Sequence, residues 1–228
     1  MVLLVAGVAL AAEPAPRKPI VAVLYFNTPD QGQGRDEWLQ LRKGLAEILI
    51  TDLVADDQFV VVERARLEEV LAELKLQATS KFDKSTAQEV GKLLGAKYLV
   101  FGSIVAEPHS GRIRMAASAL LVPTAEFVKV VQTGPRYVAE DRLFEALDAW
   151  RIDLETGIAA AEANAPATPP RPKADRVRPS FQNAVKYSRA LDAKDKKDTA
   201  RAKQLLTEVV KDQPDFKLAQ ADLLNLSN

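Results

Sequence analysis

The stretch from Phe59 to Gly102 constrains the fold most, because it places two amphipathic helices between two apolar strands. Phe59–Val62 and Tyr98–Val105 are rich in the β-branched and aromatic residues that buried strands favour. Between them, apolar residues recur at helical spacing in two segments: Leu67, Val70, Leu71 and Leu74, then Val90, Leu93 and Leu94. Two strands joined by helices in this way are typical of the parallel part of an α/β sheet.

The flanking segments extend this pattern into a complete domain. Ile20–Phe26 is predicted to be a buried strand, and Arg35–Asp56 a helix with an apolar stripe. Arg112–Val122 and Glu126–Gln132 are predicted as later strands, and a long helix follows, with Leu143, Leu147, Trp150, Leu154 and Ile158 on one side. The order β-α-β-α-α-β-β-β-α predicts an α/β (α+β) fold with a mixed sheet of about five strands and packed helices.

Local signals mark the ends of the helix that precedes Tyr98. Ser85-Thr86-Ala87-Gln88 fits a capping box, in which Ser85 would accept from a free backbone amide and Gln88 would reach back. Gly95 stands where a residue after a helix C-terminus adopts positive φ. We therefore expect a helix between these positions.

Composition shifts divide the chain into four parts. Residues 1–19 are predicted to be a signal peptide and an extended N-terminus, and residues 20–163 the α/β domain. Residues 164–180 carry several prolines among small and basic residues, which predicts a semi-rigid linker. Residues 181–228 are predicted to form a small all-α helical hairpin, and so short a segment is expected to dock on the main domain or on a partner.

The first residues favour export of the chain. MVLLVAGVALAA is a short apolar run that ends in the small-x-small pattern Ala9-Leu10-Ala11, as secretory signal peptides do. The run lacks the usual basic start, which we interpret as a start codon assigned too far downstream. We expect a periplasmic protein without a membrane-spanning segment in its mature form.

Composition argues against several classes of function. The chain has no cysteine, which excludes disulfides, thiolate zinc sites, cysteine nucleophiles and a lipidated cysteine. It has 31 basic and 31 acidic residues, so no net charge draws it to nucleic acid. We expect no catalytic residues, no cofactor and no metal.

Single charged residues also favour structural roles. His109, the one histidine, lies in a predicted turn, where a solvated role is more common than catalysis. The adjacent acids Asp56-Asp57 and Glu68-Glu69 are expected to be solvated, because neighbours on a helix point about 100° apart.

Three further features also have simple structural interpretations. Trp38 and Trp150 fall on apolar helix faces and are predicted to be core or interface residues rather than ligand platforms. The charged run Lys194–Asp198 is predicted to be a solvated turn. The loop Asn27–Gly34 follows a strand and opens a helix, but it lacks the glycine and lysine pattern of nucleotide-binding loops. A plain connection is the simpler interpretation; anion binding at the helix N-terminus is the alternative.

Five residues are candidates for interaction with a partner. Glu63-Arg64 directly follows an apolar strand, which either marks the exit from the core or provides an arginine for fixed hydrogen bonds to carbonyls or to a second subunit. Tyr187, Leu191 and Phe216 lie at apolar positions of the predicted tail helices.

Several of these segments together resemble a known family. Ile20–Asn27 (IVAVLYFN), Gly44–Glu47 (GLAE), Phe59–Arg64 (FVVVER), Val90–Tyr98 (VGKLLGAKY) and Gly102-Ser103 are similar to the CsgG family of curli-secretion and HfaB-like envelope proteins. This family is related in fold to the N-terminal domain of TolB, and the resemblance covers about residues 20–160. It implies a periplasm-facing α/β domain that assembles with its own copies or with other envelope proteins and has no enzymatic activity.

The chain departs from the pore-forming member of this family. It lacks the cysteine that is lipidated there, and the sheet uses its predicted hairpin residues, Tyr98–Gln132, so no spare pair of membrane strands is present. The tail adds a second resemblance, to one tetratricopeptide unit, on the segments Tyr187–Leu191, Thr199–Leu206 and Asp212–Phe216 with Ala219.

Our leading hypothesis is a non-catalytic periplasmic interaction protein. Its partners would be cell-envelope proteins, with a link to the outer membrane through them, and assembly with its own copies is an option. The alternatives are a periplasmic domain that senses a small ligand or anion through Asn27–Gly34, and, less favoured, a subunit of an outer-membrane secretion pore.

Overall fold

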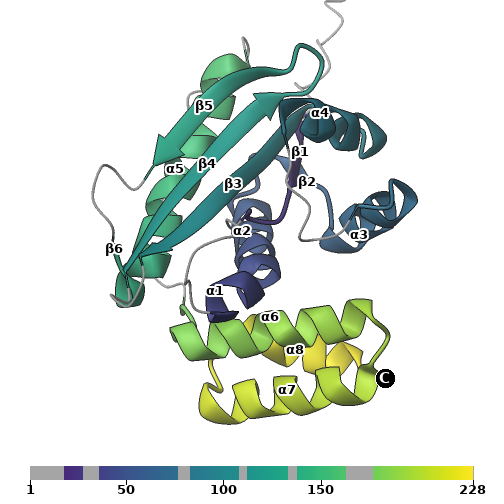
Figure 1. The fold of residues 1–228 in the computed structure, drawn as a ribbon, viewed down its shortest axis with the longest axis vertical. Helices are drawn as coiled ribbons and strands as arrows, with labels where there is room; N and C mark the ends of the chain where they lie inside the picture. The colour runs from purple at the N-terminus through teal and green to yellow at the C-terminus, as the bar shows by residue number, and fades with distance from the viewer. Residues whose placement is uncertain are drawn as a thin grey trace, which may run out of the picture.

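A mixed β-sheet forms the centre of the computed structural model, which describes residues 18–27, 36–76, 83–107, 112–132, 138–162 and 177–227 (Figure 1). Five strands follow the order β2-β1-β3-β4-β5, and a sixth, β6, pairs with β4. The strands are β1 Ile20–Val23, β2 Val60–Val61, β3 Tyr98–Glu107, β4 Arg112–Leu121, β5 Glu126–Gln132 and β6 Val138–Ala139. The predicted mixed sheet is confirmed; β6 was not foreseen.

The pairing of the strands changes from parallel to antiparallel at β3. β1 pairs in parallel with both β2 and β3, whereas β3, β4 and β5 form an antiparallel meander. In β4 the buried residues Ile113, Met115, Ala117 and Ala119 alternate with more exposed ones. The predicted alternation through Leu121 breaks at the end of the strand, where Leu120 is buried and Leu121 is half-buried. A parallel pair of strands has its carboxyl ends at one edge of the sheet, and this edge carries the site described below.

Helices cover the sheet and extend below it. Figure 1 shows α5 and α2 behind the strands, α4 and α3 at one side, and α6, α7 and α8 as a separate layer at the bottom. The helices are α1 Asp36–Gln40, α2 Arg42–Asp56, α3 Arg64–Glu73, α4 Lys84–Leu93, α5 Leu143–Ala161, α6 Phe181–Asp195, α7 Thr199–Asp212 and α8 Lys217–Asn225, with a 3₁₀ turn at Glu140–Arg142.

The core confirms the roles predicted for the two tryptophans. Trp150 stacks on Phe26 with ring centroids 6.3 Å apart, and Trp38 lies against Phe181 of the tail at 4.5 Å. Both tryptophans are almost fully buried. Trp38 therefore joins the main domain to the tail, while Trp150 belongs to the core between α5 and the sheet.

Two local predictions need correction. The cap of α4 is Asp83, whose carboxylate accepts from the backbone amide of Thr86. The predicted capping residue Ser85 lies inside the helix, and the amide of Gln88 donates to the Val122 carbonyl at 2.8 Å. Asp83, two residues before Ser85, takes the cap because its carboxylate accepts from the Thr86 amide, one of the free amides of the first turn. Gly95 does adopt positive φ, as expected.

The single helix predicted over residues 35–56 is divided at Leu41 into α1 and α2. The cause lies in the tail, because α6 contacts both helices. The predicted docking of the tail on the main domain is thereby confirmed. The boundaries proposed for the domains and the linker stay a prediction, and most of the linker lies outside the described residues.

Candidate interaction site

The carboxyl ends of β1 and β2 bring Tyr25 and Arg64 together. Tyr25 follows β1, and Arg64 opens α3 directly after β2. The Tyr25 hydroxyl donates to Glu68 one turn further along α3, and Nη1 of Arg64 lies 3.5 Å from the same hydroxyl. Because the two strands are parallel neighbours, side chains that follow them meet at one edge of the sheet.

Helix α2 adds a second pair of charges to this edge. The Lys43 ammonium lies 3.0 Å from Glu68 Oε1, and Glu47 Oε2 lies 3.1 Å from Nε of Arg64. Lys43 and Glu47 are four residues apart and so project from the same side of α2. We call Tyr25, Lys43, Glu47, Arg64 and Glu68 the junction cluster.

The tail completes the cluster with two carboxylates of α6. Asp195 accepts from Lys43 Nζ at 2.7 Å and from Arg64 Nη1 at 2.7 and 2.8 Å. Asp192 lies 3.2 Å from the Lys43 ammonium. The Arg64 side chain is 8% exposed and that of Asp195 is 16% exposed. The tail therefore adds two carboxylates that pair with the two cations of this edge.

Burial and neighbouring charges fix the protonation of most of these groups. Burial raises the pKa of Tyr25 well above its usual range. Burial acts to lower the pKa values of Lys43 and Arg64, but Asp195 and other neighbours outweigh it and raise both. Burial likewise opposes ionisation of Asp195, yet the hydrogen bonds and charges of Arg64 and Lys43 lower its pKa. Lys43 and Arg64 thus stay charged and bind the carboxylate of Asp195 in the tail.

A hydroxyl group joins α6 to the break between α1 and α2. Ser188 Oγ accepts from the Gly44 amide at 2.9 Å and donates to the Gln40 carbonyl. These two backbone groups would bond to each other in an uninterrupted helix, so Ser188 takes the place of that bond. A Cβ atom at position 44 would lie 2.9 Å from Ser188 Cβ, and only glycine permits this approach.

A second group of charges holds the start of the tail. Arg178 donates to Asp52 of α2 at 2.6 Å and to Asp148 of α5. Burial disfavours the charged guanidinium, but the two carboxylates raise the pKa of Arg178. The tail is therefore tied to the main domain at both ends of α6.

The structure places the five predicted interaction residues in different surroundings. Glu63 is exposed at the N-cap of α3, and Arg64 lies in the junction cluster. Tyr187, Leu191 and Phe216 are buried inside the tail, where Tyr187 donates to Asp222 at 2.8 Å and packs edge-on against Phe216 at 5.1 Å. Their contact with a partner molecule stays a prediction.

Three acids that were predicted to be solvated have structural partners. Glu68 binds Tyr25 and Lys43, and Asp195 belongs to α6 rather than to an open turn. Asp56 pairs with Arg151, and their side chains are 3% and 2% exposed. These predictions were wrong because each acid faces a buried cation from a distant segment. Asp57, by contrast, lies on the surface, where it pairs with Lys18.

Arg151 also holds Glu155 one turn along α5, at 3.0 Å. The Glu155 side chain is fully buried, and burial, together with Asp56, raises its pKa to about 7 against the pull of Arg151. Arg151 and Glu155 lie beside the apolar stripe of α5. This position is the one feature of the sequence that could have predicted their burial. Lys43, Ser188 and Asp195 carried no comparable signal.

Other predicted features lie beyond what the structure describes. His109 and residues 28–34 of the loop Asn27–Gly34 are outside the described residues. Asn27 itself is described and bridges to Ser103 of β3. Within the described ranges no cluster of histidine, cysteine and acidic residues could hold a metal ion. No described helix is both long and apolar enough to cross a bilayer.

Comparisons with known structures and sequences give similarities of different strength. The C-terminal domain of LpoB from Salmonella enterica is 18% identical, with a TM-score of 0.40, over 56% of this chain and 87% of that chain. TolB from Acinetobacter baumannii is 16% identical, with a TM-score of 0.41, over 64% of this chain and 29% of that chain. A lipoprotein from Neisseria meningitidis is 9% identical, with a TM-score of 0.38, over 54% of this chain and 81% of that chain.

Structural similarity at this level carries no functional argument. No curated protein matches the sequence. Residues 7–111, however, match the family described as curli production assembly/transport component CsgG. The resemblance read from the sequence motifs is confirmed for residues 7–111, which match the CsgG family model.

Proposed function

We propose that the chain is a non-catalytic interaction module of the cell envelope, exported to the periplasm, whose helical tail forms one docking body with its CsgG-family domain. The observation that carries the proposal is the family match over residues 7–111, to a component of an assembly and transport system. The junction cluster supports it, because Lys43 and Arg64 pair with carboxylates of the main domain and of the tail and so join the two into one body.

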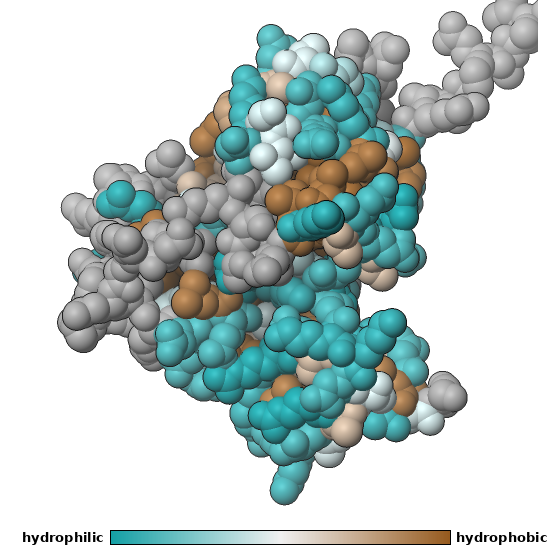
Figure 2. Space-filling model, turned by 45° about the vertical axis from the view of Figure 1, so that its right-hand side comes forward, coloured by the Kyte–Doolittle hydropathy of each residue, from teal (hydrophilic) through white to brown (hydrophobic). Residues whose placement is uncertain are grey.

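The surface of the molecule also supports a role in protein contacts. Figure 2 shows a largely hydrophilic tail below and apolar surface gathered on the upper part of the molecule. Two of the exposed apolar side chains, Phe127 and Val130, come from β5, and Phe127 also contacts Phe101 of β3. Exposed aromatic and aliphatic groups next to polar surface are typical of protein contacts.

Export and binding can be tested separately. We expect a reporter enzyme that is active only outside the cytoplasm to be active when fused after Asn228 of the full chain. A fusion that begins at Lys18 is the matched control and should be inactive. A full-length fusion that accumulates in the cytosolic fraction and is as inactive as the control contradicts the proposed location.

Binding is tested with the purified chain as bait. We expect native mass spectrometry to show self-assembly of the chain, or a pull-down from a periplasmic extract to retain envelope proteins that mass spectrometry can identify. The same pull-down from a cytosolic extract should not retain these proteins. Phe127→Ser, which removes an exposed apolar group, is the comparison variant and should reduce retention. A strict monomer that retains nothing contradicts the proposal.

A further inference from the structure

The two faces of the antiparallel strands are covered unequally. Helix α5 packs against β4 and β5, and Figure 1 shows it behind β3, β4 and β5. On the opposite face α4 packs against β3, and its Gln88 binds the carbonyl of Val122 just beyond the end of β4. Figure 1 shows no helix in front of the rest of β4 and β5. Among the described elements, this part of the sheet therefore has a helix on one face only.

The uncovered part of the sheet carries small and apolar side chains. Because residues directly opposite each other in neighbouring strands project to the same side, the strand register identifies them. We call them the open face: Phe101, Ser103, Ala116, Ser118, Phe127 and Val130. Phe101 and Phe127 have ring centroids 6.0 Å apart, and Phe127 and Val130 are 47% and 52% exposed. The alanine and the two serines leave room for a partner to approach the strands closely.

A lysine borders the open face at the end next to α4. Lys84 is the first residue of α4, and its ammonium lies 5.5 Å from the ring centroid of Phe127. The preceding carboxylate, that of Asp83, is engaged as the helix cap by the Thr86 amide. An ammonium group beside an exposed aromatic ring is complementary to a partner that carries a carboxylate next to an apolar group.

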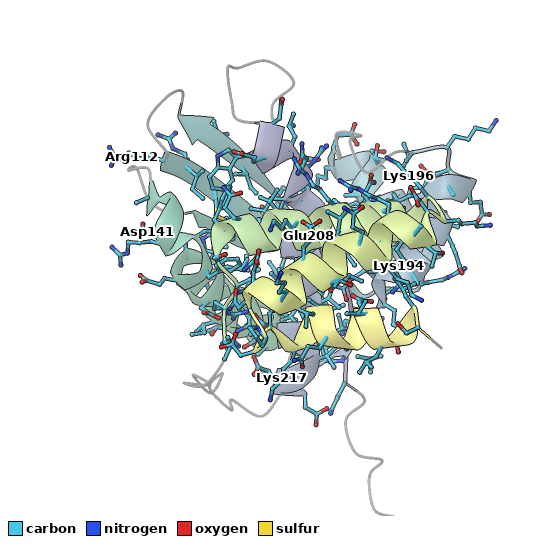
Figure 3. The ribbon with its side chains drawn as sticks, turned by 90° about the horizontal axis from the view of Figure 1, so that it is seen from below. Arg112, Asp141, Lys194, Lys196, Glu208 and Lys217 are labelled. Carbon is cyan, nitrogen blue, oxygen red and sulfur yellow. The ribbon has the colours of Figure 1, made fainter. Side chains whose placement is uncertain are left out.

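Two arginines border the opposite end of the open face. Arg112 and Arg114 project from β4 to the same side as Ala116 and Ser118, and both are exposed. Figure 3, seen from below, shows Arg112 at the margin of the molecule, away from the tail helices. Among the described side chains that β3, β4 and β5 direct to this side, the charged ones are these two arginines. A second copy placed face to face would bring like charges together, whereas an acidic partner is complementary.

The rest of the sheet indicates which kind of segment covers such a face. Helix α2 lies against β1 and β2, α5 against β4 and β5, and α4 against β3, so these covered parts are all covered by helices. Addition of a strand at the free edge of β5 is disfavoured, because Lys129 and the register shift between Ala119 and Leu120 are features that protect sheet edges. A helix is therefore the occupant that continues the layer begun by α4.

We propose that the open face binds an amphipathic helix of an envelope partner, with an apolar stripe over Phe127 and carboxylates next to Lys84 and Arg114. On β4, Arg114 is six residues from Leu120, the residue opposite Phe127. Six residues of strand extend about 20 Å. A helix of roughly 13 residues spans that distance. This inference rests on the proposed envelope role and names the kind of segment that binds.

A matched pair of designed peptides tests the charge and the shape of the occupant. Two labelled helical peptides share one leucine stripe and differ only in the flanking residues, which are glutamate in one and lysine in the other. Fluorescence polarisation with the full chain measures their affinities. We expect the glutamate peptide to bind at least about fivefold more tightly, because two or three exposed ion pairs each contribute a fraction of a kcal/mol. The difference should shrink at high salt.

Charge reversal locates the binding site. Lys84→Glu should weaken binding of the glutamate peptide and strengthen that of the lysine peptide, while Phe127→Ser should weaken both. Arg66→Glu is the matched control, since Arg66 is exposed on α3, and should leave both affinities unchanged. Both introduced glutamates stand in the first turn of a helix, where negative charge is stabilising, so the variants should fold.

Three results would overturn the proposal: neither peptide binds, both bind equally, or Lys84→Glu changes the affinities no more than Arg66→Glu does. Sedimentation adds a fourth, because a dimer of the unmodified chain that Phe127→Ser dissociates would assign the open face to a second copy. The proposed envelope role would survive each of these results, since it is judged by export and by pull-down.

Discussion

Ser188 in the tail replaces a backbone hydrogen bond of the main domain, because its hydroxyl stands between the Gly44 amide and the Gln40 carbonyl. The two helices α1 and α2 are separate for this reason. A residue far along the chain thus determines where a helix of the first domain ends, and the tail is part of the fold that it touches.

Replacing Ser188 with alanine should lower the free energy of unfolding by about 1–3 kcal/mol, because two buried backbone groups lose their partner. If α1 and α2 join by forming the missing bond, the loss will be near the lower end of this range. Urea denaturation measures the effect. Thr207→Ala is the control, since Thr207 binds the Lys203 carbonyl on the exposed surface of α7. Equal effects of the two substitutions would contradict the assigned role of Ser188.

Asp195→Asn should destabilise the chain by about 3 kcal/mol at neutral pH, because Lys43 and Arg64 would lose their shared carboxylate. The pKa of Asp195 is below its ordinary value of 3.8 in the folded chain. Its contribution is therefore complete above that value and is lost as the pH falls through the folded pKa.

The difference between this variant and the unmodified chain should accordingly shrink below about pH 4. Asp215→Asn, at an exposed turn, should have little effect at either pH. Thermal unfolding of the three proteins at pH 7 and pH 3.5 provides the measurement. A difference that stays constant between the two pH values would mean that the charge of Asp195 is not what binds the tail.

Features of the fold with local causes could be predicted from the sequence, whereas features that depend on contacts between distant residues could not. Strands β1 to β5, most of the helices and the burial of Trp38 and Trp150 followed from apolar periodicity, since burial repeats along these elements. The contact between the junction cluster and the tail could not be predicted in this way. Arg64 and Asp195 are 131 residues apart, and each resembles an ordinary surface charge in the sequence. The break at Leu41 depends on Ser188, which binds the carbonyl of Gln40 from 148 residues away. A single sequence contains no pattern that pairs such positions.

Glu155→Gln should change how stability depends on pH. The pKa of Glu155 is about 7 in the folded chain against an ordinary value of 4.5. Between these values the folded state keeps a proton that the unfolded state has released, so stability falls as the pH rises through this window. The substitution removes this titration and should flatten the decline between pH 5 and pH 8 by an amount on the order of 2 kcal/mol.

The measurement is urea unfolding of both proteins across that range. Glu145→Gln, on the exposed surface of the same helix, is the control and should leave the slope unchanged. A Glu155→Gln variant with the same decline as the unmodified chain would show that Glu155 is already ionised in the folded state at low pH, and that Arg151 outweighs its burial.

Arg178→Gln should loosen the start of the tail. Arg178 holds Asp52 of α2 and Asp148 of α5, and without it two carboxylates face each other with no shared cation. We expect a loss on the order of 2 kcal/mol, with Arg178→Lys intermediate because lysine keeps the charge but cannot bind both acids as a planar fork. Hydrogen exchange of the α6 amides should rise in the glutamine variant before that of β3, since the tail would open locally.

Arg142→Gln, which breaks an exposed pair with Glu145, is the matched control and should leave the α6 amides unchanged. If exchange in α6 and β3 increases together, the tail and sheet unfold as one unit and Arg178 stabilises the whole chain rather than the docking of its tail.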